Sequence, residues 1–300
     1  MKQITLEQLL EAGCHFGHQV TRSNPKARDF VFEARDNIQI IDLVKTKEGL
    51  DEASQFVKSL GQRGGSFLVV GTKRQAKEII VSEVKRVREL LENEEKDKNG
   101  KLFYITQRWI GGILTNFSEV SKNFKKLKDL KIKVSNPEEK ARYTKKELGL
   151  FEKEIQRLEN FYSGILDMTG KPDALFVIDC RLEDLAVREA NSTKVETVAI
   201  VDTNADPYLI DHPIPANDDA VGSIKLIVSY ILDSWYEGVK LQKPATTETQ
   251  KDNETLKIKK PATTEARKEP EALKDKKPAA TETQKKPEAQ KRKRKNVSKK

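Results

Sequence analysis

The chain has 300 residues, of which 36% are apolar and 34% charged, and its formal net charge is +9. This length and apolar content allow one or two domains with a real hydrophobic core. Two cysteines far apart exclude a disulfide framework, no apolar run reaches membrane-spanning length, and the opening residues lack a signal-peptide pattern, so we expect a cytoplasmic protein.

The first segment with chemical character is Cys14-His15-Phe16-Gly17-His18, which holds two of the three histidines. A thiol and two imidazoles can ligate zinc, but a fourth ligand is not evident. A metal site at Cys14, His15 and His18 is therefore the weaker interpretation. The stronger one is a loop whose imidazoles and Phe16 make hydrogen bonds and packing or stacking contacts. The cations that follow in this loop fit phosphate contacts, with a solvated charged loop as the alternative. The polar residues of this loop are Arg22, Asn24, Lys26, Arg28 and Arg35.

Short runs rich in β-branched and aromatic residues alternate with helical segments along the chain. Near-continuous apolar strands separated by helices are typical of a parallel sheet with helices on both faces. We therefore expect a doubly wound α/β domain with a five-stranded parallel sheet. The predicted strands are residues 38–43, 66–70, 102–106, 174–179 and 197–202.

Gly71-Thr72-Lys73-Arg74 follows the second of these strands and opens a helix, where backbone amides and the helix dipole favour an anion. It is not a nucleotide-hydrolysing phosphate loop, because the first glycine and its spacing are missing. The sequence predicts Thr72 as the cap of the helix, with Lys73 and Arg74 on a phosphate backbone.

The stretch Arg108–Phe117 joins a strand to a helical region. Its two glycines, Gly111 and Gly112, permit a turn that other residues would resist. Trp109 beside this turn suits core anchoring and nucleic-acid contact about equally.

An insertion of about 50 residues then interrupts the alternation of strands and helices. Apolar residues at three- and four-residue steps indicate two helices that pack along one seam. Thr144 with Glu147 forms a capping-box signal, and Asn136-Pro137 indicates a helix start. We expect an antiparallel helical hairpin whose turn lies near residues 131–146. Its exposed faces carry Lys122, Lys125, Lys126, Lys128, Lys131 and Lys133.

Carboxylates are dense at 202–206 and 217–219, after the last predicted strand. An α/β enzyme would place its site there, and such acids can bind Mg²⁺ or move protons. Asn and Asp also build turns and cap helices, and no companion nucleophile accompanies them. We favour a structural role, with Asn217-Asp218-Asp219 as a helix cap.

Residues 243–300 hold 19 Lys/Arg against 9 Asp/Glu, whereas residues 1–242 hold 37 against 38. The positive net charge therefore comes from this segment. It contains a 17-residue repeat that begins at Lys243, Lys260 and Lys277, and it ends in the polycation 291–295. Its composition predicts a disordered tail, which either binds phosphates with little sequence preference or only aids solubility.

Five motifs together resemble bacterial small-subunit ribosomal protein two, in the order of that family and over about residues 1–240. They are Ala12–Gln19, Val70–Arg74, Arg108–Phe117, Pro172–Asp179, and Val201–Asn204 followed by Ile214–Ala220. The family often has a small apolar residue where this chain has Cys14, which weakens a metal site that includes the thiol. The repeated basic tail departs from the usual short C-terminus.

The resemblance implies a flavodoxin-like body with a two-helix coiled-coil insertion. We assign the body to 1–115 and 166–242, the insertion to 116–165 and, from its composition, the tail to 243–300. It implies a non-enzymatic constituent of the small ribosomal subunit that binds 16S rRNA, contacts neighbouring ribosomal proteins and helps to dock ribosomal protein one. No cofactor, small-molecule substrate or membrane is implied. The alternatives are an α/β enzyme that uses the acidic loop and an adaptor that docks proteins on the hairpin.

On the matching positions we expect rRNA contacts from cations and one asparagine, and we add three lysines of the hairpin. The expected rRNA-binding residues are Arg22, Lys26, Arg28, Lys73, Arg74, Arg108, Asn116, Lys122, Lys125 and Lys126.

Overall fold

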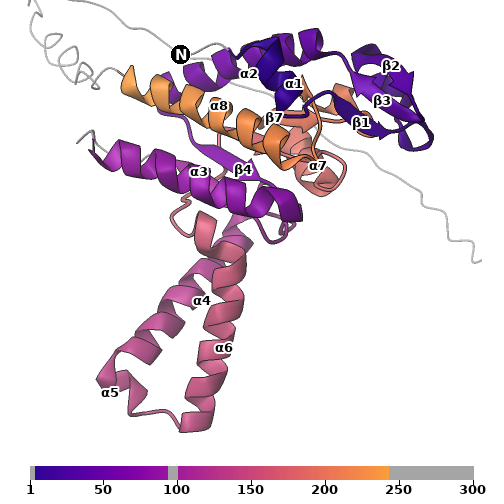
Figure 1. The fold of residues 1–300 in the computed structure, drawn as a ribbon. Coiled ribbons are helices and arrows are strands. Elements are labelled where there is room, and N and C mark those ends of the chain that lie inside the picture. Colours follow the sequence, from indigo (N-terminus) through magenta and orange to yellow (C-terminus); the bar gives the residue numbers. More distant parts are fainter. Residues whose placement is uncertain (1–3, 94–100, 243–300) are drawn as a thin grey trace, which may run out of the picture. The chain divides into compact units, whose positions relative to one another are not determined.

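A computed structural model describes residues 4–93 and 101–242 (Figure 1). Its centre is a five-stranded parallel sheet with the order β5-β4-β6-β7-β8. The predicted α/β class with a five-stranded parallel sheet is confirmed. The predicted tail at 243–300 lies outside the described residues. The strands are β4 (Phe67–Val70), β5 (Leu102–Ile105), β6 (Ala174–Val177), β7 (Glu196–Val201) and β8 (His212–Pro215).

One predicted member of this sheet was wrong. Residues 38–43 do not enter the parallel sheet, and its fifth strand is β8, which was not among the predicted strands. The four-residue sequence of β8 contains Pro213 and Pro215, and such a sequence is more typical of a loop than of a strand. It forms because it pairs with β7 alone at the sheet edge, where a residue without a backbone N–H is tolerated.

The N-terminal region instead forms a small antiparallel sheet with the order β1-β3-β2. Its strands are β1 (Phe16–Gln19), β2 (Val31–Arg35) and β3 (Ile38–Ile41). Asp36 and Asn37 connect β2 to β3, and both have positive φ angles, of 49° and 64°. Two consecutive left-handed residues are the geometry of the tight hairpin turns that match strand twist. The short helices η1 (Val20–Arg22) and η2 (Pro25–Phe30) lie between β1 and β2.

Alternate residues of the parallel strands face opposite sides and build two cores. Phe67, Val69 and Phe176 face the first core, whereas Leu68, Val70 and Leu175 face the second. The first core is covered by α1 (Leu6–Glu11), α2 (Leu43–Gln62), α3 (Arg74–Asn93) and α8 (Val221–Lys240). The second core is covered by α7 (Asp184–Thr193) and by the root of the helical insertion. No helix in the described part of the chain is long and apolar enough to cross a membrane.

The helices α2 and α8 pack closely at Gly61 and Gly238. A Cβ at Gly238 would lie 2.1 Å from the carbonyl oxygen of Lys58, and a Cβ at Gly61 would lie 2.4 Å from that of Trp235. Both positions therefore require glycine, because only a missing side chain lets the two backbones approach.

The insertion forms α4 (Phe117–Ser135), the single turn α5 (Pro137–Lys140) and α6 (Lys145–Tyr162), followed by η3 (Ser163–Ile165). α4 and α6 pack side by side and extend away from the sheet (Figure 1). The predicted seam is buried near the sheet, where Phe124 stacks edge-on against Tyr162 with ring centroids 5.3 Å apart. Asn136 caps α5, and Thr144 with Glu147 forms the predicted capping box.

The root of this hairpin is fixed by Glu189 of α7. Its buried carboxylate accepts hydrogen bonds from the backbone amides of Gly112, Leu114 and Thr115, at 2.8, 3.2 and 3.4 Å. The indole Nε1 of Trp109 also donates to it, at 3.2 Å. Trp109 is only 6% exposed, so this indole anchors the core. The turn that precedes the hairpin is thus held by hydrogen bonds to the single carboxylate of Glu189.

We expect Glu189→Ala to lower the free energy of unfolding by about 3 kcal/mol or more, because each buried donor left without a partner costs about 1–3 kcal/mol. Urea denaturation followed by circular dichroism measures this. The control Glu152→Gln, on the exposed face of α6, should change stability by no more than about 0.5 kcal/mol. Equal effects of the two substitutions would contradict the role assigned to Glu189.

Candidate functional site

The carboxyl ends of the parallel strands gather charged side chains around Lys73. This residue follows β4, and its Nζ lies 3.1 Å from Asp179 Oδ2, at the end of β6. The same Nζ lies 2.7 Å from Asp218 Oδ1 and 2.7 Å from Asp219 Oδ1, both beyond β8. β4 and β6 flank the point where the strand order reverses, the usual ligand position of open α/β sheets.

Burial and mutual repulsion set the ionisation of this cluster. Burial raises the pKa of Asp218 to about 7, and the neighbouring charges of Asp179 and Asp202 add to the rise. For Lys73, burial favours the neutral amine, but the carboxylates of Asp218, Asp219 and Asp179 outweigh it and raise the pKa of the ammonium group. Lys73 is therefore a permanent cation that offsets part of the cluster's negative charge.

His18 of β1 closes the other side of the cluster. Its Nδ1 lies 3.1 Å from Asp202 Oδ1 and its Nε2 lies 3.5 Å from Asp219 Oδ2. The hydrogen bond to Asp202 raises the pKa of His18, although burial opposes the rise. Asn204 Nδ2 lies 2.9 Å from His18 Nε2. The N-terminal sheet is thus joined to the strand ends of the body through this imidazole.

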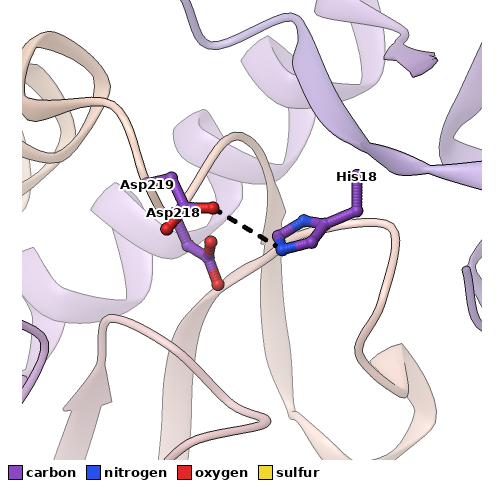
Figure 2. A group of neighbouring side chains, drawn as sticks. All are labelled: His18, Asp218 and Asp219. Carbon is purple, nitrogen blue, oxygen red and sulfur yellow. Dashed lines mark ion pairs between the residues drawn. The ribbon is translucent and has the colours of Figure 1, made fainter. Parts of the chain in front are cut away.

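Figure 2 shows the imidazole of His18 directed toward Asp218 and Asp219, and one ligand atom from each of these residues lies within 4.8 Å of the others. Such a set can ligate a divalent cation. Of the predicted metal candidates only His18 belongs to it. Cys14 is buried beside Ser223 and burial raises its pKa, while the ring of His15 packs on Phe16. Lys73 already provides a positive charge to both aspartates.

The anion position predicted at Gly71–Arg74 is filled from within. The amide of Thr72 donates to Glu183 Oε1 at 3.1 Å, and the Thr72 hydroxyl donates to the same carboxylate. The prediction that Thr72 caps this helix was wrong, because α3 begins at Arg74. Thr72 binds Glu183 instead. Burial raises the pKa of Glu183. The amide and hydroxyl of Thr72 are therefore bound by a side chain of this protein.

The acidic loops serve the fold, in agreement with the structural role favoured from the sequence. Asp202 accepts hydrogen bonds from the amide and hydroxyl of Thr203. The carboxamide oxygen of Asn217 accepts from the amides of Asp219 and Ala220, at 2.8 and 3.1 Å, just before α8. These are turn contacts rather than an array for catalysis. The predicted cap at Asn217-Asp218-Asp219 was wrong, because Ala220 is the residue before α8 and no side chain caps that helix.

The basic loop lies beside these strand ends. The amide of Asn24 donates to the Thr203 carbonyl at 2.8 Å, and Lys26 Nζ lies 2.5 Å from Asp206 Oδ2. Arg22 and Arg28 in the same loop are exposed. The structure therefore brings the loop, Lys73 and the acidic segments to one end of the sheet, while Arg74 beside Lys73 is exposed.

The remaining predicted residues lie on the hairpin and its root. Arg108, Asn116 and Lys125 are exposed. Lys122 pairs with Glu119 at 2.7 Å, and Lys126 reaches across the hairpin to Glu154 at 2.7 Å. These contacts leave the lysines at the surface, where exposed ion pairs contribute little to stability.

Sequence reasoning missed Asp179, Glu183 and Glu189 as organising residues. Asp179 carried a usable signal, because it ends a strand at the same sheet edge as Lys73. Glu183 and Glu189 carried none, since acids in and before an amphipathic helix usually face solvent.

This cluster should make the folded chain less stable as pH rises from about 4 to about 8. The pKa of Asp218 is raised from 3.8 to about 7, so between these values the folded chain holds a proton that the unfolded chain has released, and this stability is lost as pH rises through about 7. The raised pKa of His18 acts in the same direction above 6.5. We expect urea denaturation to show a loss of about 1 kcal/mol between about pH 6 and about pH 8. Asp218→Asn should flatten the dependence, and an unchanged slope would contradict this origin.

The sequence of this chain is similar to those of known proteins. The family model described as ribosomal protein S2 matches residues 9–238. The small ribosomal subunit protein uS2 of Coprothermobacter proteolyticus is 46% identical over 239 residues, which is 79% of this chain and 84% of that protein. The chain therefore belongs to the ribosomal protein S2 family, whose members are ribosomal proteins and not enzymes.

Proposed function

We propose that this protein is a structural constituent of the small ribosomal subunit that binds 16S rRNA by phosphate and shape contacts. The observation that carries the proposal is a set of exposed cations without an ion-pair partner among the described residues. They are Arg22, Arg28, Arg74, Arg108 and Lys125. A cation that its own protein does not neutralise is available to a phosphate group.

The other residues that we predict to contact rRNA differ in exposure and in their ion-pair partners. Lys26, Lys122 and Lys126 are more than half exposed and can exchange a surface carboxylate for a phosphate at little cost. Asn116 is exposed at the start of α4 and can donate its amide. Lys73 is the least suited of the set, because its ammonium group is held by three carboxylates and is 15% exposed.

We further propose a division into a body (1–115 and 166–242), a coiled-coil arm (116–165) and a tail (243–300). The strand order β5-β4-β6-β7-β8 is a 2-1-3-4-5 order within the sheet, which supports a flavodoxin-like body. The 17-residue repeats of the tail support an auxiliary role in phosphate binding.

A contact with protein partners, including ribosomal protein one, is supported by apolar side chains on the small sheet. Phe32 is 71% exposed, Phe16 49% and Ile38 38%. Aromatic side chains left open to solvent are typical of surfaces that a partner covers.

We expect the triple substitution Arg22→Gln, Arg28→Gln and Arg74→Gln to lower occupancy of the small subunit. Three lost phosphate contacts should reduce the slope of log affinity against log salt by about 2–3. Sucrose gradients of reconstituted small subunits measure occupancy, and filter binding to 16S rRNA at several salt concentrations measures the slope. The control Arg188→Gln removes an exposed arginine that pairs with Asp184. Unchanged occupancy and slope in the triple variant would refute the assigned contacts.

We expect Phe32→Ser to lower the amount of ribosomal protein one that sediments with small subunits several-fold, while occupancy by this protein stays unchanged. Mass spectrometry of the purified subunits measures both quantities. The control Leu150→Ser removes an apolar side chain of similar exposure, 57%, from the hairpin. Equal recovery of ribosomal protein one in both variants would argue against the small sheet as its docking surface.

A further inference from the structure

A cavity of about 340 Å³ lies at the root of the hairpin, where the loop after β5 meets α4 and α6. Arg108 and Trp109 line it from the loop, Asn123 from α4, and Arg157, Phe161 and Tyr162 from α6. This volume lies within the range of about 300–1,000 Å³ that small-ligand sites have.

Two arginines and no acidic residue line the cavity. Arg157 is held by Glu154, with Nε to Oε2 and an amino group to Oε1 both at 2.8 Å. Arg108 is exposed and has no ion-pair partner among the described residues. The fork of Arg157 is thus already occupied by a carboxylate of this protein. The guanidinium of Arg108 is available, and guanidinium forks match phosphate oxygens.

The walls of the cavity are aromatic. Trp109 and Tyr162 are each 6% exposed and are fixed by hydrogen bonds, the first to Glu189 and the second from Asn123 Nδ2 at 3.0 Å. Phe161 is only partly buried against the second core. Its ring therefore remains able to receive a planar group, and a base stacked on an aromatic side chain gains about 1–3 kcal/mol.

We propose that this cavity takes one unpaired nucleotide of single-stranded RNA, with its base against Phe161 and its phosphate at the guanidinium group of Arg108. The combination of an unpaired cation, an open aromatic ring and room for a single nucleotide carries the inference. A base inside a duplex cannot enter, because it is paired and stacked on both sides. The proposal rests on the proposed rRNA binding and adds to it a place where one base is recognised.

The test uses the full chain and two RNAs of equal length, an unpaired oligoadenylate with one central 2-aminopurine and a fully paired duplex. Phe161→Ala should weaken binding to the single strand about tenfold, since one lost stacking contact is worth about 1–3 kcal/mol. It should leave duplex binding unchanged. The fluorescence of 2-aminopurine should change on binding to the unaltered chain and much less with Phe161→Ala. Arg108→Gln should weaken single-strand binding and lower the salt slope by about one.

Two further variants separate recognition from folding. Phe161→Leu keeps an apolar side chain but removes the aromatic face, so it should fold normally by circular dichroism and still bind the single strand more weakly. Tyr143→Ala removes a ring from the far end of the same hairpin, where it packs on Phe151, and should bind both RNAs like the unaltered chain.

Single-strand binding that is equal in Phe161→Leu, Phe161→Ala and the unaltered chain would overturn the nucleotide site while leaving rRNA binding intact. Displacement of the single strand by an oligoglutamate peptide at a lower concentration than free adenosine monophosphate would also overturn the nucleotide site. Failure of the unaltered chain to bind either RNA would instead overturn the proposed function.

Discussion

The structure depends on the contact of one lysine with three carboxylates. Lys73 lies within 3.1 Å of Asp179, Asp218 and Asp219, and so ties the ends of β4 and β6 to the segment after β8. A charge removed from water must be paired, because the cost of an isolated one is several kcal/mol. The interaction occupies the position where open α/β sheets usually bind ligands. Beside it, the carboxylate of Glu183 binds the amide of Thr72, so side chains of the protein itself pair with one another at this position.

The hairpin is attached by the same physical device. Glu189 is a buried acid whose carboxylate accepts hydrogen bonds from a loop, just as Asp202 accepts them from Thr203 and Asp218 at the strand ends. A carboxylate that accepts several backbone hydrogen bonds fixes the path of the chain more firmly than apolar packing, because its partners have defined directions. The root of the hairpin therefore holds its geometry, and the residues around Trp109 and Tyr162 can form a cavity with fixed walls.

The parts that sequence predicts best are those with local repetition. The seam along Phe117, Phe124 and Leu127 and the capping box at Thr144 are set within a few residues, so the hairpin helices could be predicted. β8 could not, since its strand character comes from pairing with β7. Lys73 and Arg74 are equivalent cations in sequence, and only the fold directs one into the carboxylates and the other to solvent. The hydrogen-bond partners of Glu189 lie 74 to 80 residues before it in the sequence, so no local sequence pattern predicts these contacts.

Acidic and basic side chains are divided unequally between the interior and the surface of the body, which bears on how a nearly neutral domain could bind a polyanion such as RNA. Residues 1–242 contain 37 Lys/Arg and 38 Asp/Glu. Among the described residues, however, every charged side chain that is buried is acidic: Glu83, Asp179, Glu183, Glu189, Asp202 and Asp218. These interior acids are held by amides and hydroxyls or paired with a cation, as Asp218 is with Lys73 and Glu83 with Arg86. The surface of the described residues is therefore richer in basic side chains than the composition of the body, which supports the proposed contacts of its exposed cations with RNA.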